Sequence, residues 1–175
     1  MDHRLHGDRI PLAEMLSVAG VDFTVHQHDE IRTAEDIRSK TWFSIERSVK
    51  SLAFTVDTGR VVLAAVPGPA RLQYGRLAAA IDVRRSALKP ASADILAALK
   101  MEPGGVSPIC RDPAVTVVLD SAVPQMGRVF CGSGRADCTL ELLGADIARF
   151  VSNLVVSEIA APSGVADAGR SLDQR

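Results

Sequence analysis

The sequence predicts an α/β (mixed α+β) fold, in which helices surround a mixed β-sheet. Two runs rich in β-branched residues, 48–56 and 61–66, flank a glycine-containing turn, and this pattern is typical of an antiparallel hairpin. Apolar residues at helical spacing separate the other strand-like runs, and helical crossovers allow parallel pairing. The 175 residues are 47% apolar but only 4% aromatic, so we expect one domain with a core of Leu, Val, Ile and Ala.

The first elements are predicted to be a helix, a strand and a second helix. Apolar residues recur at helical spacing over 12–19, with Pro11 in the first turn and Gly20 at the end. Residues 21–26 alternate between apolar and polar side chains, which indicates a half-buried strand. Thr33 precedes two acidic residues and is expected to cap the helix that follows.

After the hairpin, apolar spacing and turn residues predict five further elements. In order, these are a helix near 72–81, a helix near 95–99 with Ser92 as its N-cap, a buried strand at 115–119 that ends at Asp120, a hairpin formed by 128–131 and 138–142, and a helix carrying Ile147, Phe150, Val151 and Leu154. Ser, Gly, Ala and Asp dominate the C-terminus. We therefore expect a single domain over 1–160 and a disordered tail over 161–175.

Charged residues make up 23% of the chain and nearly cancel, leaving a net charge of −1. This balance gives no general attraction to nucleic acid, so a polyanionic partner would need a local basic patch. The densest basic region is 71–100, where Asp82 and Asp94 are the only acidic residues. This region either meets a phosphate backbone or forms a solvated face.

Cysteine usage and apolar runs indicate the compartment. Cys110, Cys131 and Cys138 are an odd number without C-x-x-C spacing, so neither a disulfide framework nor a structural zinc site is expected. The first residues are polar and lack the apolar segment of a signal peptide, and the longest apolar run, 61–66, is too short to cross a bilayer. We expect a cytoplasmic protein with no membrane partner, no metal and no cofactor.

The loop at 102–110 is the first candidate for a ligand site. Pro103 and Pro108 bracket two glycines and a serine, so neither a helix nor a central strand can continue through it. Such a loop is either a rigid cradle of backbone N–H groups or a tight connection and nothing more. Cys110 beside it is either a nucleophile or a buried, inert thiol.

Other polar residues extend the candidate site. Lys50 lies among apolar neighbours near the start of a strand, where it either reaches water or binds an anion. His26 and His28 share the polar face of their strand, without a third ligand for a metal. The two histidines either line a site or are ordinary surface residues. Lys50, the loop at 102–110, Asp120 and the Gly-Ser-Gly turn at 132–134 suit an anionic or carbonyl-bearing ligand, although no general base is evident.

An ordered series of short motifs resembles the YbaK/prolyl-tRNA synthetase-associated (INS-like) domain family, whose members are freestanding or fused domains that hydrolyse mischarged aminoacyl-tRNA. The series spans roughly 26–150, and although each motif is weak alone, their order and spacing are specific. It consists of His28, Thr33, Val49-Lys50-Ser51-Leu52, Ala65-Val66-Pro67-Gly68, Gly104-Gly105-Val106-Ser107-Pro108, Val118-Leu119-Asp120 and Gly132-Ser133-Gly134.

The resemblance implies a barrel-like mixed sheet and a role for each motif. Lys50 corresponds to the family's essential lysine, which holds the tRNA 3′ end. The loop of Gly104, Gly105, Val106, Ser107 and Pro108 would hold the aminoacyl ester and terminal adenosine through its backbone, and Ser133-Gly134 would close the amino-acid pocket. Two departures are present. Ile109-Cys110 stands where the family often has Phe-Gly, which puts the amino-acid specificity in question, and Ser51 replaces a threonine.

The leading hypothesis is therefore a freestanding aminoacyl-tRNA deacylase. Its expected partner is the 3′ acceptor end of tRNA(Pro) carrying a small amino acid such as Ala or Cys, together with prolyl-tRNA synthetase. Editing depends on a pocket that admits small side chains and excludes larger ones. Two alternatives stay open: a non-catalytic tRNA- or synthetase-binding module of the same fold, and a small-nucleotide or metabolite-binding protein.

Overall fold

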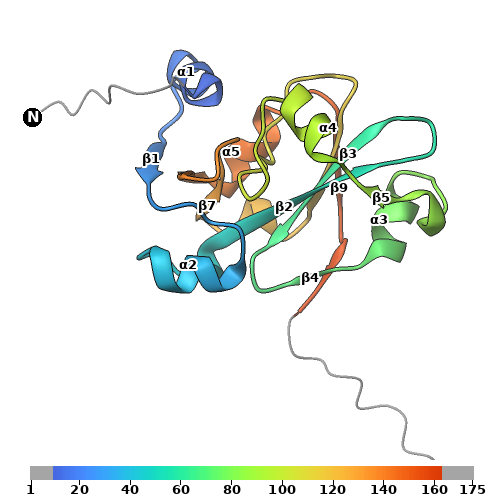
Figure 1. Ribbon diagram of the computed structural model, residues 1–175, viewed down its shortest axis with the longest axis horizontal. Helices are drawn as coiled ribbons and strands as arrows, with labels where there is room; N and C mark the ends of the chain where they lie inside the picture. The colour runs from blue at the N-terminus through green and yellow to red at the C-terminus, as the bar shows by residue number, and fades with distance from the viewer. Residues whose placement is uncertain (1–9, 163–175) are drawn as a thin grey trace, which may run out of the picture.

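A computed structural model describes residues 10–162, which form a large mixed sheet with helices around it (Figure 1). Within this range eight strands belong to one sheet, in the order β1-β8-β7-β2-β3-β6-β9, and β5 pairs with the far end of β2. The predicted fold class is confirmed. The strands of this sheet are β1 (Thr24–Gln27), β2 (Ser48–Thr55), β3 (Val61–Pro67), β5 (Lys89–Pro90), β6 (Thr116–Asp120), β7 (Arg128–Gly132), β8 (Cys138–Leu143) and β9 (Leu154–Ser157).

Both predicted hairpins are present. In the first, β2 and β3 pair antiparallel with Lys50 opposite Val66, and in the second, β7 and β8 pair antiparallel with Gly132 opposite Thr139. A parallel pairing of Ser48 and Val49 with the end of β7 joins the two hairpins. This pairing places the start of β2 beside the end of β7 and the turn that connects β7 to β8.

The helices are short and carry the expected signals at their ends. Thr33 caps α2 as predicted, with its Oγ1 accepting a hydrogen bond from the Asp36 N–H, and Ser92 caps α4. In Figure 1, α2 lies near the start of β2, while α3 and β5 lie near its other end. The α-helices are α1 (Pro11–Val18), α2 (Ala34–Lys40), α3 (Tyr74–Ala80), α4 (Ala93–Ala98) and α5 (Gly144–Arg149), and the 3₁₀ turns are η1 (Ile45–Arg47), η2 (Arg85–Ala87) and η3 (Val123–Gln125).

The prediction for the last helix is wrong beyond Arg149. Helix α5 ends there, and Leu154, expected on the same helix, instead begins β9 and pairs with Val117 of β6 in parallel. Between α5 and β9, the Ser152 N–H donates a hydrogen bond to Cys110 O and not to a preceding helical carbonyl, so the helix does not continue through this segment. Strand β9 covers the edge of β6, and this tertiary pairing overrides a local spacing that fits a helix equally well.

Two short strands pair with each other outside the main sheet. Leu72, expected on a helix, belongs to β4 (Arg71–Leu72), which pairs with β10 (Ala160–Ala161). Strand β10 includes the first residue of the predicted tail, so the ordered domain continues through Ala161, whereas 163–175 lie outside the described residues. No helix among residues 10–162 is long and apolar enough to span a bilayer.

Candidate active site

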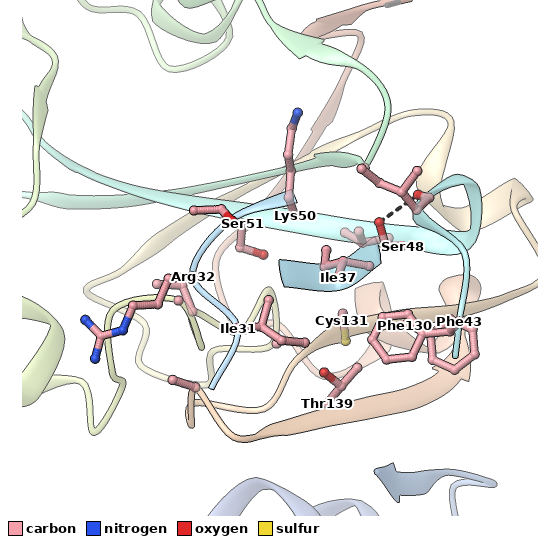
Figure 2. A pocket seen from close by; sticks show the side chains of 18 of the residues that line it. Ile31, Arg32, Ile37, Phe43, Ser48, Lys50, Ser51, Phe130, Cys131 and Thr139 are labelled. Carbon is pink, nitrogen blue, oxygen red and sulfur yellow. Dashed lines mark hydrogen bonds between the residues drawn. The ribbon is translucent and has the colours of Figure 1, made fainter. Parts of the chain in front are cut away.

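A pocket of about 340 Å³ opens beside the start of β2. Figure 2 shows the side chains around it, which include residues from the β1–α2 connection, the start of β2, the end of β7 and the start of β8. Its floor is apolar: Phe43 and Phe130 stack with ring centroids 4.4 Å apart, and Ile31 is buried beside them. A pocket of this size and lining is suited to a small apolar side chain with a polar group at its mouth.

Lys50 supplies the positive charge at the mouth. Its side chain extends away from the floor in Figure 2, and its Nζ donates a hydrogen bond to Ala70 O in the loop after β3. Partial burial lowers the pKa of Lys50, and the nearby positive charge of Arg71 lowers it further. Lys50 and Arg71 are close enough to repel each other, so an anionic group, such as a phosphate, placed between them would stabilise both.

The 104–108 loop forms one wall, and it packs directly against the 132–134 turn. The Gly134 N–H donates to Gly105 O at 2.7 Å, and the Glu102 N–H donates to Gly134 O at 2.7 Å. A Cβ on Gly105 would lie 2.3 Å from the carbonyl carbon of Arg135, and one on Gly132 would lie 2.1 Å from Val106 O. These glycines therefore allow backbone to pack on backbone, which fixes the wall of the pocket.

Part of the loop still presents donors. Gly104 has φ +86, and a Cβ there would meet Ile31 O at 2.3 Å, so its conformation and its space both require glycine. Within residues 10–162, the backbone N–H groups of Gly104, Val106 and Ser107 have no hydrogen-bond partner, and the first two residues line the pocket. The loop can therefore donate hydrogen bonds to a carbonyl or phosphate oxygen.

Comparison with known proteins identifies the family. A family model for the aminoacyl-tRNA editing domain matches residues 28–150, which is most of the chain and includes the whole pocket. The chain belongs to the aminoacyl-tRNA editing domain family. This membership confirms the resemblance inferred from the ordered motifs. The comparison with curated protein sequences found no match.

Solved structures share the fold of this editing domain. The hypothetical protein APE2540 superposes with a TM-score of 0.70 at 21% identity, covering 85% of this chain and 98% of that one. A protein described as a candidate trans-editing enzyme for prolyl tRNA synthetase superposes with a TM-score of 0.66 at 20% identity, covering 86% of this chain and 93% of that one. At these identities the likeness establishes the architecture alone.

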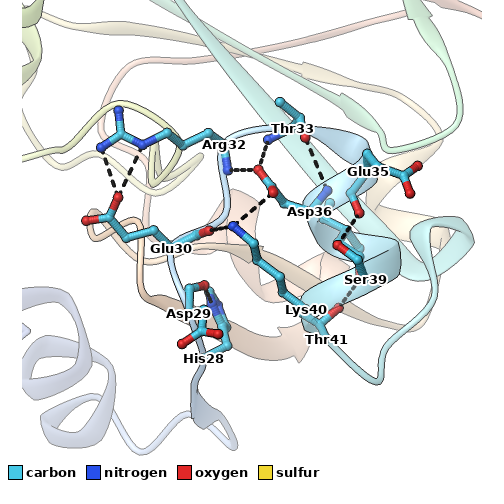
Figure 3. A network of polar contacts seen from close by, with 11 residues as sticks. His28, Asp29, Glu30, Arg32, Thr33, Glu35, Asp36, Ser39, Lys40 and Thr41 are labelled. Carbon is cyan, nitrogen blue, oxygen red and sulfur yellow. Dashed lines mark hydrogen bonds and ion pairs between the residues drawn. The ribbon is translucent and has the colours of Figure 1, made fainter.

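Several of the residues predicted for the site do line the pocket of the editing domain. They are His28, Thr33, Lys50, Gly104, Val106 and Gly132. Thr33 reaches it from the N-terminus of α2, where Thr33 and Asp36 bond reciprocally in a capping box (Figure 3). Hydrogen bonds from the Arg32 N–H and from Lys40 hold the pKa of Asp36 well below its usual range. Hydrogen bonds around Asp36 therefore fix the position of the α2 N-terminus beside the pocket.

Other predicted site residues support the wall from behind. Ser107 Oγ accepts a hydrogen bond from the Ile109 N–H and is almost fully buried. Ser133 Oγ donates to Cys138 O at 2.7 Å, which closes the turn between β7 and β8. Gly105, Pro108 and Gly134 also lie outside the pocket lining. Their contacts are those of a rigid frame, and a direct role in binding stays a prediction.

Asp120 lies away from the pocket. It is 3% exposed, and its Oδ2 accepts hydrogen bonds from the N–H groups of Ile159 and Ala160, both at 2.9 Å. Its Oδ1 accepts a third from the Ala122 N–H at 3.0 Å. A carboxylate bonded to three backbone donors holds the start of β10 in place, and Asp120 does not line the pocket, so its substrate role stays a prediction from the sequence.

We expect Asp120→Ala to act on stability and not on turnover. Three backbone N–H groups, one of them on the fully buried Ile159, would lose their acceptor, which should cost about 3 kcal/mol in the free energy of unfolding. Urea denaturation and kcat/KM per folded molecule measure the two effects. Asp112→Ala is the matched control, because Asp112 bonds one N–H in an exposed turn. A normally stable Asp120→Ala protein with reduced kcat/KM would instead place Asp120 in the site.

The structure also adds pocket residues that were not predicted. They come from β2, the α2–η1 segment and the second hairpin, and include Phe43, Ser51, Phe130, Cys131 and Thr139. The Ser51 Oγ is buried and has no hydrogen-bond partner in the described part of the chain. The apolar members look like ordinary core in the sequence, and only strand pairing places them around one opening.

Cys110 is not a candidate nucleophile. It lies outside the pocket lining and packs with Leu63, Leu96 and Val117 in a core cluster. Burial raises the pKa of its thiol, which keeps it protonated at neutral pH. Ile109 is also buried and packs in the core with Val49 and Leu119. The departure at Ile109-Cys110 therefore concerns the packing behind the wall.

Proposed function

We propose that this chain is a freestanding aminoacyl-tRNA deacylase that hydrolyses the ester of mischarged tRNA, with tRNA(Pro) carrying Ala or Cys as its substrate. The observation that carries the proposal is Lys50 at the mouth of an apolar pocket. The lysine is placed to hold the phosphate of the terminal nucleotide, with Arg71 close enough to reinforce it. The aminoacyl group would then extend toward the floor.

The shape of the floor supports a small amino acid. Phe43 and Phe130 are stacked and almost fully buried, so they cannot move aside without opening the core. A rigid apolar floor admits a methyl or thiol group and excludes larger side chains by overlap. The likeness to a protein described as a candidate trans-editing enzyme for prolyl tRNA synthetase supports tRNA(Pro) as the carrier.

A deacylation panel tests the proposal. Purified protein is incubated with tRNA(Pro) charged with Ala, Cys, Ser or Pro and with correctly charged tRNA(Ala) and tRNA(Cys), and ester loss is followed by acid gel. We expect rapid loss of Ala or Cys from tRNA(Pro) and slow loss of Pro. Salt-sensitive tRNA binding without turnover would favour a binding module, and nucleotide binding without tRNA affinity would favour a metabolite-binding protein.

Trp42 is the residue at the rim that we expect to contact the single-stranded 3′ end. It is 71% exposed, and its ring meets Phe130 edge-on with centroids 5.5 Å apart. Unpaired bases stack on aromatic rings, and each stack contributes about 1–3 kcal/mol. Trp42→Ala should therefore raise KM for the charged tRNA about tenfold with little change in kcat, as measured by steady-state deacylation.

The control for Trp42 separates stacking from lost apolar surface. Trp42→Phe keeps an aromatic face and should recover most of the affinity. Val18→Ala removes a comparably exposed apolar side chain on α1, away from the pocket, and should leave KM unchanged. Equal KM values for Trp42→Ala and the unmodified protein would show that the 3′ end takes another path.

A further inference from the structure

We propose that His28 and Thr139 form the proton-transfer pair of the deacylation, in which Thr139 contacts the attacking water and His28 takes up the proton. This inference rests on the proposed function and assigns it a base, which the sequence alone lacks. His28 follows directly after β1, Thr139 is the second residue of β8, and both line the pocket. Their side chains meet at 2.7 Å, between His28 Nε2 and Thr139 Oγ1.

The second ring nitrogen decides the direction of that hydrogen bond. His28 Nδ1 lies 2.7 Å from the backbone oxygen of Asp29, and a carbonyl oxygen can only accept. Nδ1 therefore carries the proton, and in the neutral ring Nε2 is left with a lone pair. The Thr139 hydroxyl then donates to His28 Nε2. A hydroxyl bonded to a base that a third group orients is the arrangement that activates oxygen nucleophiles.

The backbone holds the pair in place from both sides. The His28 N–H donates to Asp137 O at 3.0 Å, which ties the end of β1 to the chain just before Thr139. Thr139 is 8% exposed and sits opposite Gly132 in the β7–β8 pairing. Figure 2 places it on the floor near Phe130 and Ile31. When the Thr139 hydroxyl donates to His28, its oxygen keeps both lone pairs and can accept a proton from a water bound in the pocket that Thr139 lines.

The neighbouring histidine shows that this arrangement is not a general property of the strand. His26 lies on β1, two residues before His28, but its Nε2 is 2.8 Å from a carboxylate oxygen of Glu141. Arg128 bonds the same carboxylate, and these two partners lower the pKa of Glu141. His26 is therefore part of an ion-pair network outside the pocket, whereas His28 bonds a neutral hydroxyl inside it.

Other nucleophilic or basic groups in the pocket are less suited to this step. Burial raises the pKa of Cys131 to about 12 and that of Cys138 to about 11, so both thiols stay protonated and unreactive. Lys50 donates to Ala70 O and is placed for an anion. His28 is the histidine among the described side chains that line the pocket, and histidine is the side chain that most often acts as a general base.

The chemical step balances without a further reactant. Water oxygen attacks the ester carbonyl carbon and gives a proton to Thr139 Oγ1, while the Thr139 proton passes to His28 Nε2. The tetrahedral intermediate then collapses, and the bond between the carbonyl carbon and the ribose oxygen breaks. The proton returns from His28 through Thr139 to that ribose oxygen. The products are the free amino acid and tRNA with its hydroxyl restored, and both side chains regain their starting states.

Paired substitutions test the inference in the full chain. Thr139→Val keeps the shape of the side chain and removes the hydroxyl, and His28→Gln removes the base. Each is expected to lower kcat for mischarged tRNA about 100-fold with KM within about twofold, because general-base assistance is typically worth 10²–10⁴-fold. Thr139→Ser should stay within about fivefold of the unmodified kcat. His26→Gln, the matched histidine outside the pocket, should leave kcat unchanged.

The outcomes separate this inference from the proposed function. Added imidazole should restore part of kcat to His28→Ala, an effect that a purely structural histidine would not give. Full kcat in Thr139→Val, or a change confined to KM in both variants, would overturn the inference while leaving a deacylase. No turnover by the unmodified protein on any charged tRNA would overturn the proposed function and this pair with it. Thermal melts of each variant confirm that the comparison is made between folded proteins.

Discussion

Replacing Lys50 by alanine is expected to lower deacylation by about 1,000-fold, the largest effect on turnover of any single change considered. Lys50 places a positive charge at the mouth of an apolar pocket, where few polar groups compete for a bound phosphate. Loss of one such electrostatic contact costs about 100- to 1,000-fold in rate, and poor positioning of the ester adds to it. Single-turnover deacylation of charged tRNA(Pro) measures the change.

Two further variants identify what the lysine contributes. Lys50→Met keeps most of the length without charge and should be as inactive as alanine, whereas Lys50→Arg keeps the charge and should recover part of the rate. Lys89→Ala is the matched control, because Lys89 is an exposed lysine of β5 in the same sheet. If Lys50→Met retained most of the rate, the charge at the mouth would be unimportant and the proposed binding mode would be wrong.

The depressed pKa of Lys50 gives this electrostatic argument a pH dependence. Burial and Arg71 both favour the neutral amine, so Lys50 loses its proton at a lower pH than an exposed lysine does. Binding that requires the ammonium is therefore full at neutral pH and lost as pH rises through the lowered pKa. A bound phosphate opposes this shift, so bound tRNA should move the alkaline loss of activity to higher pH.

Local signals in the sequence were enough to predict most of the fold. The hairpin of β2 and β3 follows from two β-branched runs around a turn, and the caps at Thr33 and Ser92 follow from residue type alone. The failures occur where tertiary pairing decides. The apolar spacing of Leu154 fits either a helix or a strand, and only the free edge of β6 selects the strand. The short β4 and β10 carry no periodic signal.

The site was predictable where it lies on one continuous segment. The Gly-containing loop at 104–108 and Lys50 both have unusual local chemistry, and both border the pocket. The partnership of His28 and Thr139 could not be predicted, because 111 positions separate them and only the β1–β8 pairing brings them together. Asp120 is the opposite case. Its carboxylate suggests a ligand-binding group in the sequence, but in the fold it accepts hydrogen bonds from backbone N–H groups of a distant segment.

Gly132→Ala is expected to cause the largest loss of stability among the glycine substitutions in the site. The added Cβ would lie 2.1 Å from Val106 O and 2.8 Å from Gly105 O, so it would collide with backbone that has no flexible end to move. We expect a loss of about 3 kcal/mol, the cost of overpacking a rigid contact. The melting temperature should fall by roughly 6–12 °C, as measured by circular dichroism.

Two other glycines separate the collision from the general effects of adding a methyl group. Gly75 lies in α3 with nothing within 4 Å of an added Cβ, so Gly75→Ala should stabilise by about 0.5 kcal/mol through helix propensity. Gly59 is equally open but has φ +80, so Gly59→Ala should cost about 1 kcal/mol from backbone strain alone. If Gly132→Ala had the same melting temperature as Gly75→Ala, the 104–108 loop and the 132–134 turn would not be in contact as described.

The same collision links stability to activity. Gly132 lies directly against Val106, whose backbone N–H faces no partner within residues 10–162. A shift that relieves the contact must move the 104–108 loop toward the pocket or away from it, and either movement displaces the donors proposed to hold the ester. Residual folded Gly132→Ala should therefore bind charged tRNA through Lys50 yet turn it over slowly. That combination, lost kcat with retained affinity, would distinguish a misplaced wall from a missing charge.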